Sequence, residues 1–212
     1  MKKFVCVVCS LLIVSGCGLS KRTEKSASEL VTEGRQEFQD EDYRDAVESF
    51  KQLKNWYPFS EYVKEAEINI ADSYFEMKKY EEAILAYSDF EKLHPLSKNA
   101  EKSAFRIGVC YYKQILTIDR DQTFTEKALS GFRRFLAKYP DSKYVDKAVK
   151  YSGICIDKLA EADLYVAKFY LKQKSYAAAK ARLIELKDKY KDTKAGKEAV
   201  SLIEKFKKEL NK

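Results

Sequence analysis

The chain has 212 residues, of which 45% are hydrophobic, and its 40 Lys and Arg against 33 Asp and Glu give a net charge of +7. Only seven glycines and one histidine occur, with no glycine-rich phosphate loop, no Cys/His metal-ligand spacing and no G-x-S-x-G motif. The composition therefore argues against nucleotide-dependent, zinc-dependent and serine-hydrolase enzymes and predicts a non-enzymatic protein that acts by binding.

Residues 1–16 have the pattern of an export signal that ends in a lipobox. Lys2 and Lys3 precede an apolar run at 4–14, which is too short to span a membrane as a mature helix, and small residues precede Cys17. Cys17 is the predicted lipidation site, since its thiol can receive a diacylglyceryl group and its freed amine an acyl chain. The alternatives are an ordinary signal peptide with a chance cysteine, or an N-terminal anchor helix.

The predicted lipid implies that the mature protein is held on a membrane. One acyl chain binds a bilayer only marginally, whereas two or three chains anchor a protein stably. Gly18 follows the cysteine, which favours sorting to the outer membrane, on its periplasmic face. Residues 17–26 are polar and predict a flexible tether. No cofactor other than this covalent lipid is expected.

The rest of the chain contains one unit that recurs four times. Three prolines each follow an aromatic residue or histidine, an alanine precedes each proline by twelve residues, and an aromatic follows each alanine by four. The three copies are Ala46, Phe50 and Pro58; Ala83, Tyr87 and Pro95; and Ala128, Phe132 and Pro140. A fourth copy has Ala179, Leu183 and Lys191 at these positions.

These offsets predict an all-α fold: a right-handed superhelical solenoid of tetratricopeptide-like helix-turn-helix repeats. In each repeat a small residue on the first helix lets the second helix approach closely, and the aromatic fills the space beside it. The predicted small residues are Gly34, Ala71, Gly108 and Gly153. Proline ends the second helix, because it has no N–H to donate. The predicted N-caps of the next helices are Ser60, Ser97, Ser142 and Thr193.

Residues 27–212 form this solenoid, and its predicted repeats are 27–60, 61–97, 98–142 and 143–193, followed by a capping helix at 194–210. The distances between successive proline positions are 37, 45 and 51 residues. We assign the extra residues of the third repeat to a loop around 117–125. The extra residues of the fourth repeat predict an overlong first helix within residues 143–174, a segment that has no proline and one glycine.

Cysteine and histidine have structural interpretations in this arrangement. Cys110 and Cys155 lie on the first helices of neighbouring repeats, and we expect buried free thiols, although a disulfide is possible if they face each other. His94 takes a position that is tyrosine in the other repeats, which favours packing at the turn over a ligand or base role. The acidic runs at 40–42 and 81–82 suit turns and helix starts.

Binding surfaces are predicted at both ends of the solenoid. Residues 143–212 hold 18 basic and 10 acidic residues, a net +8, which suits an acidic partner or lipid headgroups but also a solvated helical face. A peptide groove is predicted from aromatics outside the repeat core, for which ordinary packing is the alternative: Phe38, Tyr62, Phe75 and Tyr112. No nucleic-acid partner is expected.

From the lipobox to about residue 205 the chain resembles the BamD family of lipoproteins of the outer-membrane β-barrel assembly machinery. The resemblance rests on the repeat pattern, the long fourth-repeat helix and several short stretches: 57–62 (YPFSEY), 106–108 (RIG), 137–144 (AKYPDSKY), 157–160 (DKLA) and 166–170 (VAKFY). The chain ends at Lys212, and we expect it to lack a final helix that enteric relatives have, which leaves open the contacts that depend on that helix and any role for accessory lipoproteins.

The resemblance implies a function by binding alone. N-terminal repeats would receive the C-terminal strand of unfolded outer-membrane β-barrel proteins, and C-terminal repeats would dock a POTRA domain of the BamA-type barrel subunit. Arg182 matches a family arginine that pairs with an acidic POTRA residue, and a guanidinium can bind a carboxylate through two hydrogen bonds. The alternative function is a repeat lipoprotein that scaffolds pilus assembly or cell division.

Overall fold

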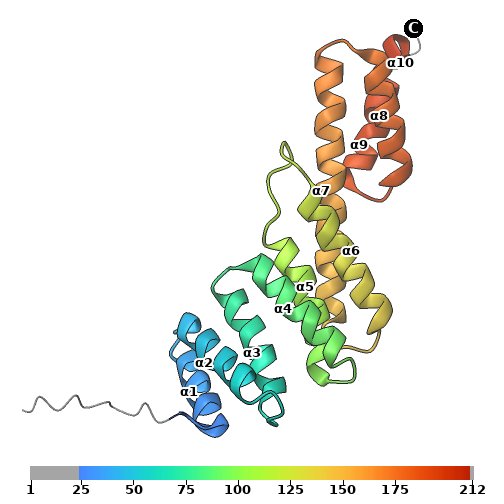
Figure 1. Cartoon of the computed structure of the whole chain (residues 1–212). Helices are drawn as coiled ribbons and strands as arrows, with labels where there is room; N and C mark the ends of the chain where they lie inside the picture. Colours follow the sequence, from blue (N-terminus) through green and yellow to red (C-terminus); the bar gives the residue numbers. More distant parts are fainter. Residues whose placement is uncertain (1–23, 211–212) are drawn as a thin grey trace, which may run out of the picture.

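The structure is a computed structural model and describes residues 24–210, in which all regular secondary structure is helical. The helices pack in chain order as a staggered stack (Figure 1). Their bounds are α1 Ala27–Gln39, α2 Tyr43–Trp56, α3 Val63–Glu76, α4 Tyr80–Leu93, α5 Lys98–Tyr112, α6 Thr123–Lys138, α7 Val145–Lys172, α8 Tyr176–Lys189, α9 Lys194–Lys205 and α10 Lys207–Leu210. Within this range none of the helices is both long and apolar enough to cross a bilayer.

The turn inside three of the four helix pairs has the same unusual backbone. Glu41, Lys78 and Lys174 have φ of 65°, 60° and 58°, the left-handed region in which a Cβ is unfavourable. Each lies five residues before the alanine of its repeat. In each turn the N–H of the residue after the left-handed one donates a hydrogen bond back to a carbonyl of the first helix, for example from Lys79 N to the Tyr74 carbonyl at 2.9 Å. In the third pair this turn is replaced by residues 113–122, the longer loop that the spacing predicts.

The turn between successive pairs also recurs, and the prolines mark it as predicted. α2, α4 and α6 end directly before Tyr57, His94 and Tyr139, whose φ values are −129°, −129° and −131°. A proline follows each of these residues. The fourth turn, at Tyr190, has φ −126° without a proline, so the packing around it also stabilises this conformation.

Close approach of the two helices in a pair explains the small residues of the repeat. A Cβ on Gly34 would lie 2.8 Å from the Phe50 ring, and a Cβ on Gly108 would lie 2.7 Å from the Phe132 ring. The prediction for Gly153 is wrong: its side of α7 is exposed, and a Cβ there would meet nothing within 4 Å. Ala167 instead lies twelve residues before Ala179, as Gly34 does before Ala46, and it is fully buried.

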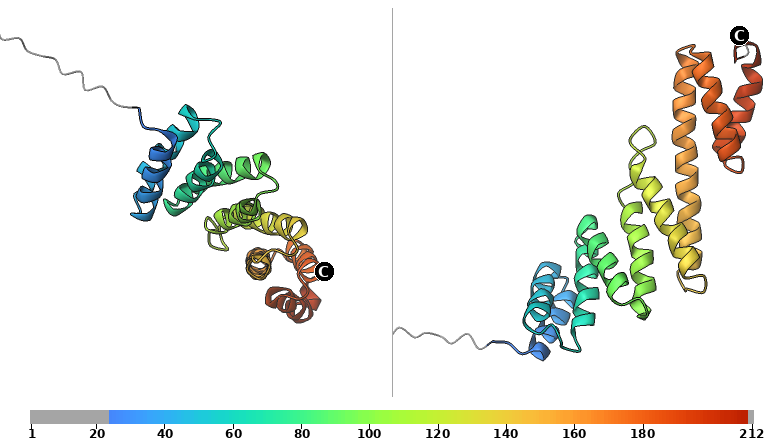
Figure 2. Two further views of the ribbon diagram at one scale, coloured as in Figure 1. Left: turned by 90° about the horizontal axis from the view of Figure 1, so that it is seen from below. Right: turned by 45° about the vertical axis from the view of Figure 1, so that its right-hand side comes forward.

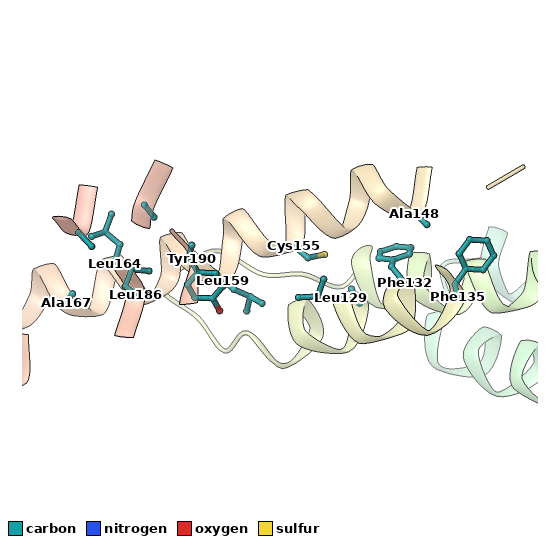
Figure 3. Packing of buried hydrophobic residues seen from close by; sticks show 14 of the residues in the cluster. Leu129, Phe132, Phe135, Ala148, Cys155, Leu159, Leu164, Ala167, Leu186 and Tyr190 are labelled. Atoms are coloured by element: carbon teal, nitrogen blue, oxygen red, sulfur yellow. The ribbon is translucent and has the colours of Figure 1, made fainter. Parts of the chain in front are cut away.

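The overlong helix of the fourth repeat is confirmed, since α7 has 28 residues. It contacts α6 on one side and α8 and α9 on the other. In Figure 3, Ala148 and Cys155 of its first half face the rings of α6, whereas Leu164 and Ala167 of its second half face Leu186 of α8. Gly153 fails as the small residue because the first half of α7 continues the stack and only the second half pairs with α8.

The helix starts and the C-terminal cap differ in part from the prediction. Ser97 and Thr193 are N-caps, and their hydroxyls accept hydrogen bonds from Asn99 N at 3.2 Å and Gly196 N at 3.0 Å. Ser60 and Ser142 are not, because α3 and α7 begin three residues later, after short turns closed by bonds of 3.1 and 3.0 Å from the first helical N–H to the serine carbonyl. The capping helix is interrupted at Phe206, which ends α9 and separates it from α10.

The two cysteines of the described chain are free and buried, as predicted. Cys110 packs with Tyr87 and Phe90 in one apolar cluster, while Cys155 belongs to the cluster formed with α6 to α9. Burial raises the thiol pKa to about 12 for Cys110 and about 11 for Cys155. Both thiols therefore stay protonated and act as small apolar side chains.

Candidate interaction surfaces

A groove of about 490 Å³ lies between α2 and α4, with α3 as its floor. Ile70 and Tyr74 of α3 lie in this floor, Phe90 of α4 lines the groove beside them, and Leu85 and Leu93 are exposed along α4. Lysines line the α2 side and carboxylates the α4 side: Lys51, Lys54, Glu82 and Asp89. An apolar floor between walls of opposite charge suits an extended polypeptide.

One wall of this groove is fixed by a buried carboxylate. Glu67 of α3 is bonded to Lys54 Nζ at 2.8 Å and to His94 Nε2 at 2.6 Å. Burial alone would raise the pKa of Glu67, but the hydrogen bonds from Lys54 and His94 outweigh it and lower that pKa. His94 also packs on Phe90, with ring centroids 4.9 Å apart, so the packing role predicted for His94 is confirmed.

Two further buried carboxylates connect the second pair to the third. Asp72 of α3 accepts hydrogen bonds from the Tyr87 hydroxyl at 2.6 Å and from Lys102 Nζ of α5 at 2.5 Å. Glu91 of α4 is paired with Lys138 of α6 at 2.8 Å and with Arg134 at 3.3 Å. Breaking one of these contacts would leave a buried charge unpaired, so they hold the second helix pair against the third.

The four aromatics predicted to line a peptide groove are not brought together. Each is half-buried at the edge of an apolar cluster. Phe38 packs edge-on against Tyr43, and Tyr62, which packs against the same cluster, lies near the Arg35 guanidinium. The remaining two also have neighbours: the Arg106 guanidinium lies 4.1 Å from the Phe75 ring centre, and the Tyr112 and Tyr151 centroids are 4.6 Å apart. None of the four lines the groove between α2 and α4.

Arg182 lies on α8, near the far end of the stack, with a half-exposed side chain. Its Nη1 is 3.7 Å from a carboxylate oxygen of Glu185, an exposed pair that contributes little stability. Asp163 of α7 lies nearby; burial raises its pKa, while Lys189 and Arg182 oppose that shift. The guanidinium is therefore held in a charged cluster and remains open to a carboxylate from another molecule. Its role as a partner contact stays a prediction.

A second, smaller groove was not anticipated from the sequence. About 240 Å³ lies between the 113–122 loop, α7 and α9, lined by Ile118, Leu164 and Tyr165 and crossed by a 2.5 Å ion pair from Lys168 to Glu198. Its signal was the long third-repeat loop, whose apolar residues have no place in the repeat pattern. The α2–α4 groove also had a signal, because Leu85 lies off the apolar face that contains Ala83 and Tyr87.

Two of the sequence-based predictions concern chemistry outside these surfaces. Cys17 lies outside the described residues, so its lipidation stays a prediction. Within residues 24–210 no group of three or more His, Cys, Asp or Glu is placed to hold a metal ion.

Comparison with known proteins identifies similar chains. The family model YfiO, described as an outer membrane lipoprotein, matches residues 23–212. Relatives named "Outer membrane protein assembly factor BamD" include one from Neisseria gonorrhoeae, 24% identical over 100% of this chain and 86% of its own length. Another from Rickettsia prowazekii is 29% identical over 89% of this chain and 76% of its own. Among solved structures, the TPR2AB domain of yeast Sti1 in its pHSP90 complex is 17% identical, with a TM-score of 0.52 over 86% of this chain and 73% of that chain. This likeness confirms the tetratricopeptide-like solenoid.

Proposed function

Because the chain belongs to the YfiO family of outer membrane lipoproteins, we propose that it is an assembly factor for outer-membrane β-barrel proteins that acts by binding. The observation that carries the proposal is the family match over residues 23–212, which spans the whole helical stack. Relatives that carry the name BamD cover nearly the full chain, and that name describes outer membrane protein assembly. The stack offers surfaces for two partners at opposite ends.

The first partner is the BamA-type barrel subunit, docked through a POTRA domain on α8. Arg182 supports this assignment, because its guanidinium is half-exposed and is held internally only by a 3.7 Å contact. A carboxylate from the partner could displace Glu185 and bind the guanidinium through two hydrogen bonds. The net positive charge of residues 143–212 would attract an acidic domain.

The second partner is an unfolded outer-membrane β-barrel protein, bound by the N-terminal repeats. The α2–α4 groove supports this assignment because it combines an apolar floor with basic and acidic walls. Such a surface can bury the alternate apolar side chains of an extended segment. The lipid on Cys17 would keep the solenoid on the periplasmic face of the outer membrane, where these substrates insert.

Crosslinking in membranes tests the POTRA assignment. A photoreactive residue at position 181, next to Arg182, should capture a barrel protein that carries POTRA domains. Arg182→Glu should reduce that capture at least about tenfold, because it replaces attraction with repulsion at a hydrogen-bonded charge pair. Arg44→Glu, at an exposed arginine of α2, is the matched control and should leave capture unchanged. Recovery of a pilus or cell-division component in place of a POTRA protein would refute the proposal.

A further inference from the structure

The first three of the turns that join successive helix pairs lie along the lower edge of the stack in Figure 1, and the fourth, between α8 and α9, lies higher. Two exposed positions recur in each turn: the last residue of the second helix, and the residue after the proline or, in the fourth turn, after Lys191. In the first two turns these positions are apolar and highly exposed, with Trp56 at 50%, Phe59 at 100%, Leu93 at 60% and Leu96 at 99%. In the third and fourth turns they are charged: Lys138, Asp141, Lys189 and Asp192.

The fold does not require the apolar residues. All four turns are closed by the same hydrogen bond, from the N–H of the serine or threonine to the carbonyl three residues earlier, at 3.0, 3.0, 3.2 and 3.0 Å. Asp141 and Asp192 therefore occupy the same turn as Phe59 and Leu96. Phe59 and Leu96 are wholly exposed and add no packing to the chain, so these two residues indicate contact with something outside it.

The position of the N-terminus identifies what lies at this edge. α1 begins here, and the Tyr57 hydroxyl donates a 2.8 Å hydrogen bond to the Lys25 carbonyl, which fixes the start of the described chain against the first turn. Cys17 precedes Glu24 by seven residues, so even a fully extended chain would reach only about 25 Å. A lipid on Cys17 would hold this edge close to the bilayer.

The long helix is directed away from this edge. α7 begins at the third turn and runs for 28 residues, about 42 Å at the rise of an α-helix. Figure 2 shows it extending, together with α8 and α9, beyond α1 to α6 on the side opposite the first three turns. The apolar turns are also those closest to the anchored end, whereas the charged turns belong to the pairs farther along the stack.

We propose that Trp56, Phe59 and Leu96, with Leu93 where this edge meets the α2–α4 groove, form a membrane-contact edge that inserts into the interfacial layer of the bilayer. The inference rests on the proposed lipid attachment at Cys17. Tryptophan prefers the membrane–water interface, and apolar side chains beside it add to binding by leaving water. Lys64, which shares a hollow with Leu93 and Leu96, would reach the headgroup phosphates. The lipid and this edge together would fix the orientation of the solenoid, with α7 and α8 directed into the periplasm.

The single tryptophan of the chain allows a direct test. The full-length lipidated protein is placed in phosphatidylcholine vesicles whose acyl chains carry bromine, which quenches only a nearby indole. Trp56 should be quenched by at least half, and its emission should shift to shorter wavelength. Phe59→Asp combined with Leu96→Asp, which copies the third and fourth turns, should remove most of that quenching. Val200→Lys, at an exposed apolar residue of α9, should not change it.

The outcomes separate this inference from the proposed function. Mass spectrometry and flotation report whether Cys17 carries lipid and whether the protein stays with the vesicles. If it is lipidated and floats but Trp56 is unquenched, the membrane-contact edge is refuted while the anchor stands. If Trp56 becomes shielded only after a barrel protein is added, the edge binds protein and the inference is likewise overturned. A protein without lipid that does not float refutes the anchor, and the inference with it. The wild-type measurement decides the matter even if the double variant folds poorly.

Discussion

Replacing Tyr87 with phenylalanine should measure what one buried hydrogen bond contributes to the stack. The Tyr87 ring is fully buried, and its hydroxyl donates to Asp72 at 2.6 Å. Burial and the Asp72 carboxylate raise the pKa of Tyr87, so the hydroxyl stays protonated and remains a donor. Phe50 and Phe132 occupy the same repeat position, so the phenylalanine ring should fit without strain.

The expected cost of Tyr87→Phe is about 1.5–3 kcal/mol of unfolding free energy, the range for a buried hydrogen bond to a charged group. Asp72 retains its bond to Lys102, which places the expected value near the lower end. Adding Asp72→Val gives the pair that the third repeat has at these positions, Val109 and Phe132. The double variant should therefore lose less than the sum of the two single variants, by about 1 kcal/mol or more.

Urea unfolding followed by circular dichroism gives these free energies. Tyr74→Phe is the matched control, because its hydroxyl accepts a 2.7 Å bond from the exposed Lys51, and its cost should stay below about 1 kcal/mol. A Tyr87→Phe loss below about 0.5 kcal/mol, or purely additive single variants, would contradict the reasoning, because the buried hydrogen bond would then have no net value.

Three further predictions follow from the backbone and the cysteines. Gly153→Ala should stabilise the protein by about 0.5–1 kcal/mol, because alanine has a higher helix propensity than glycine at an exposed helical position. Gly108→Ala should destabilise it, because the added Cβ would collide with an aromatic ring of α6. If urea unfolding showed both variants to change the unfolding free energy in the same direction, the packing argument would be refuted. Lys78→Gly should raise the unfolding free energy by up to about 1 kcal/mol, since glycine adopts the left-handed φ of 60° without the steric cost of a Cβ. A loss of stability would show that contacts of the Lys78 side chain outweigh this cost. Cys110 and Cys155 should resist a thiol reagent at mildly alkaline pH until denaturant is added, because burial raises both thiol pKa values; rapid labelling of the folded protein would show that they are accessible.

Much of the local structure could be predicted from the sequence because each repeat solves the same packing problem. Gly34 meets the Phe50 ring within one helix pair, and Gly108 meets the Phe132 ring in the same way in the third pair, so fixed offsets reveal the contact. The prolines mark helix ends for an equally local reason, the missing N–H. Gly153 shows where this reasoning fails: its offset from Pro140 was correct, but α7 had two different helix partners along its length.

The candidate binding residues depended more on the fold. The predicted groove aromatics were chosen because the repeat core did not use them, yet Phe75 and Tyr112 pack between neighbouring pairs, which a single-repeat pattern does not describe. The α2–α4 groove and the pairing of Glu67 with both Lys54 and His94 join residues from three helices. Such contacts depend on how successive pairs are rotated against each other.

The sequence by itself determined the repeated helix pairs and the long helix of the fourth pair, because these follow from spacing, proline chemistry and side-chain size, whereas the structure decided that the two cysteines are free. The tertiary structure alone decided which residues share an edge. Phe59 and Leu96 are 37 residues apart in the chain, yet stacking places their turns along the same side as the N-terminus. The apolar turns and the start of the described chain lie on one side of the stack, and the long helix α7 is directed to the other. This arrangement exists only in the folded stack, since each helix pair is positioned by packing against the pair before it.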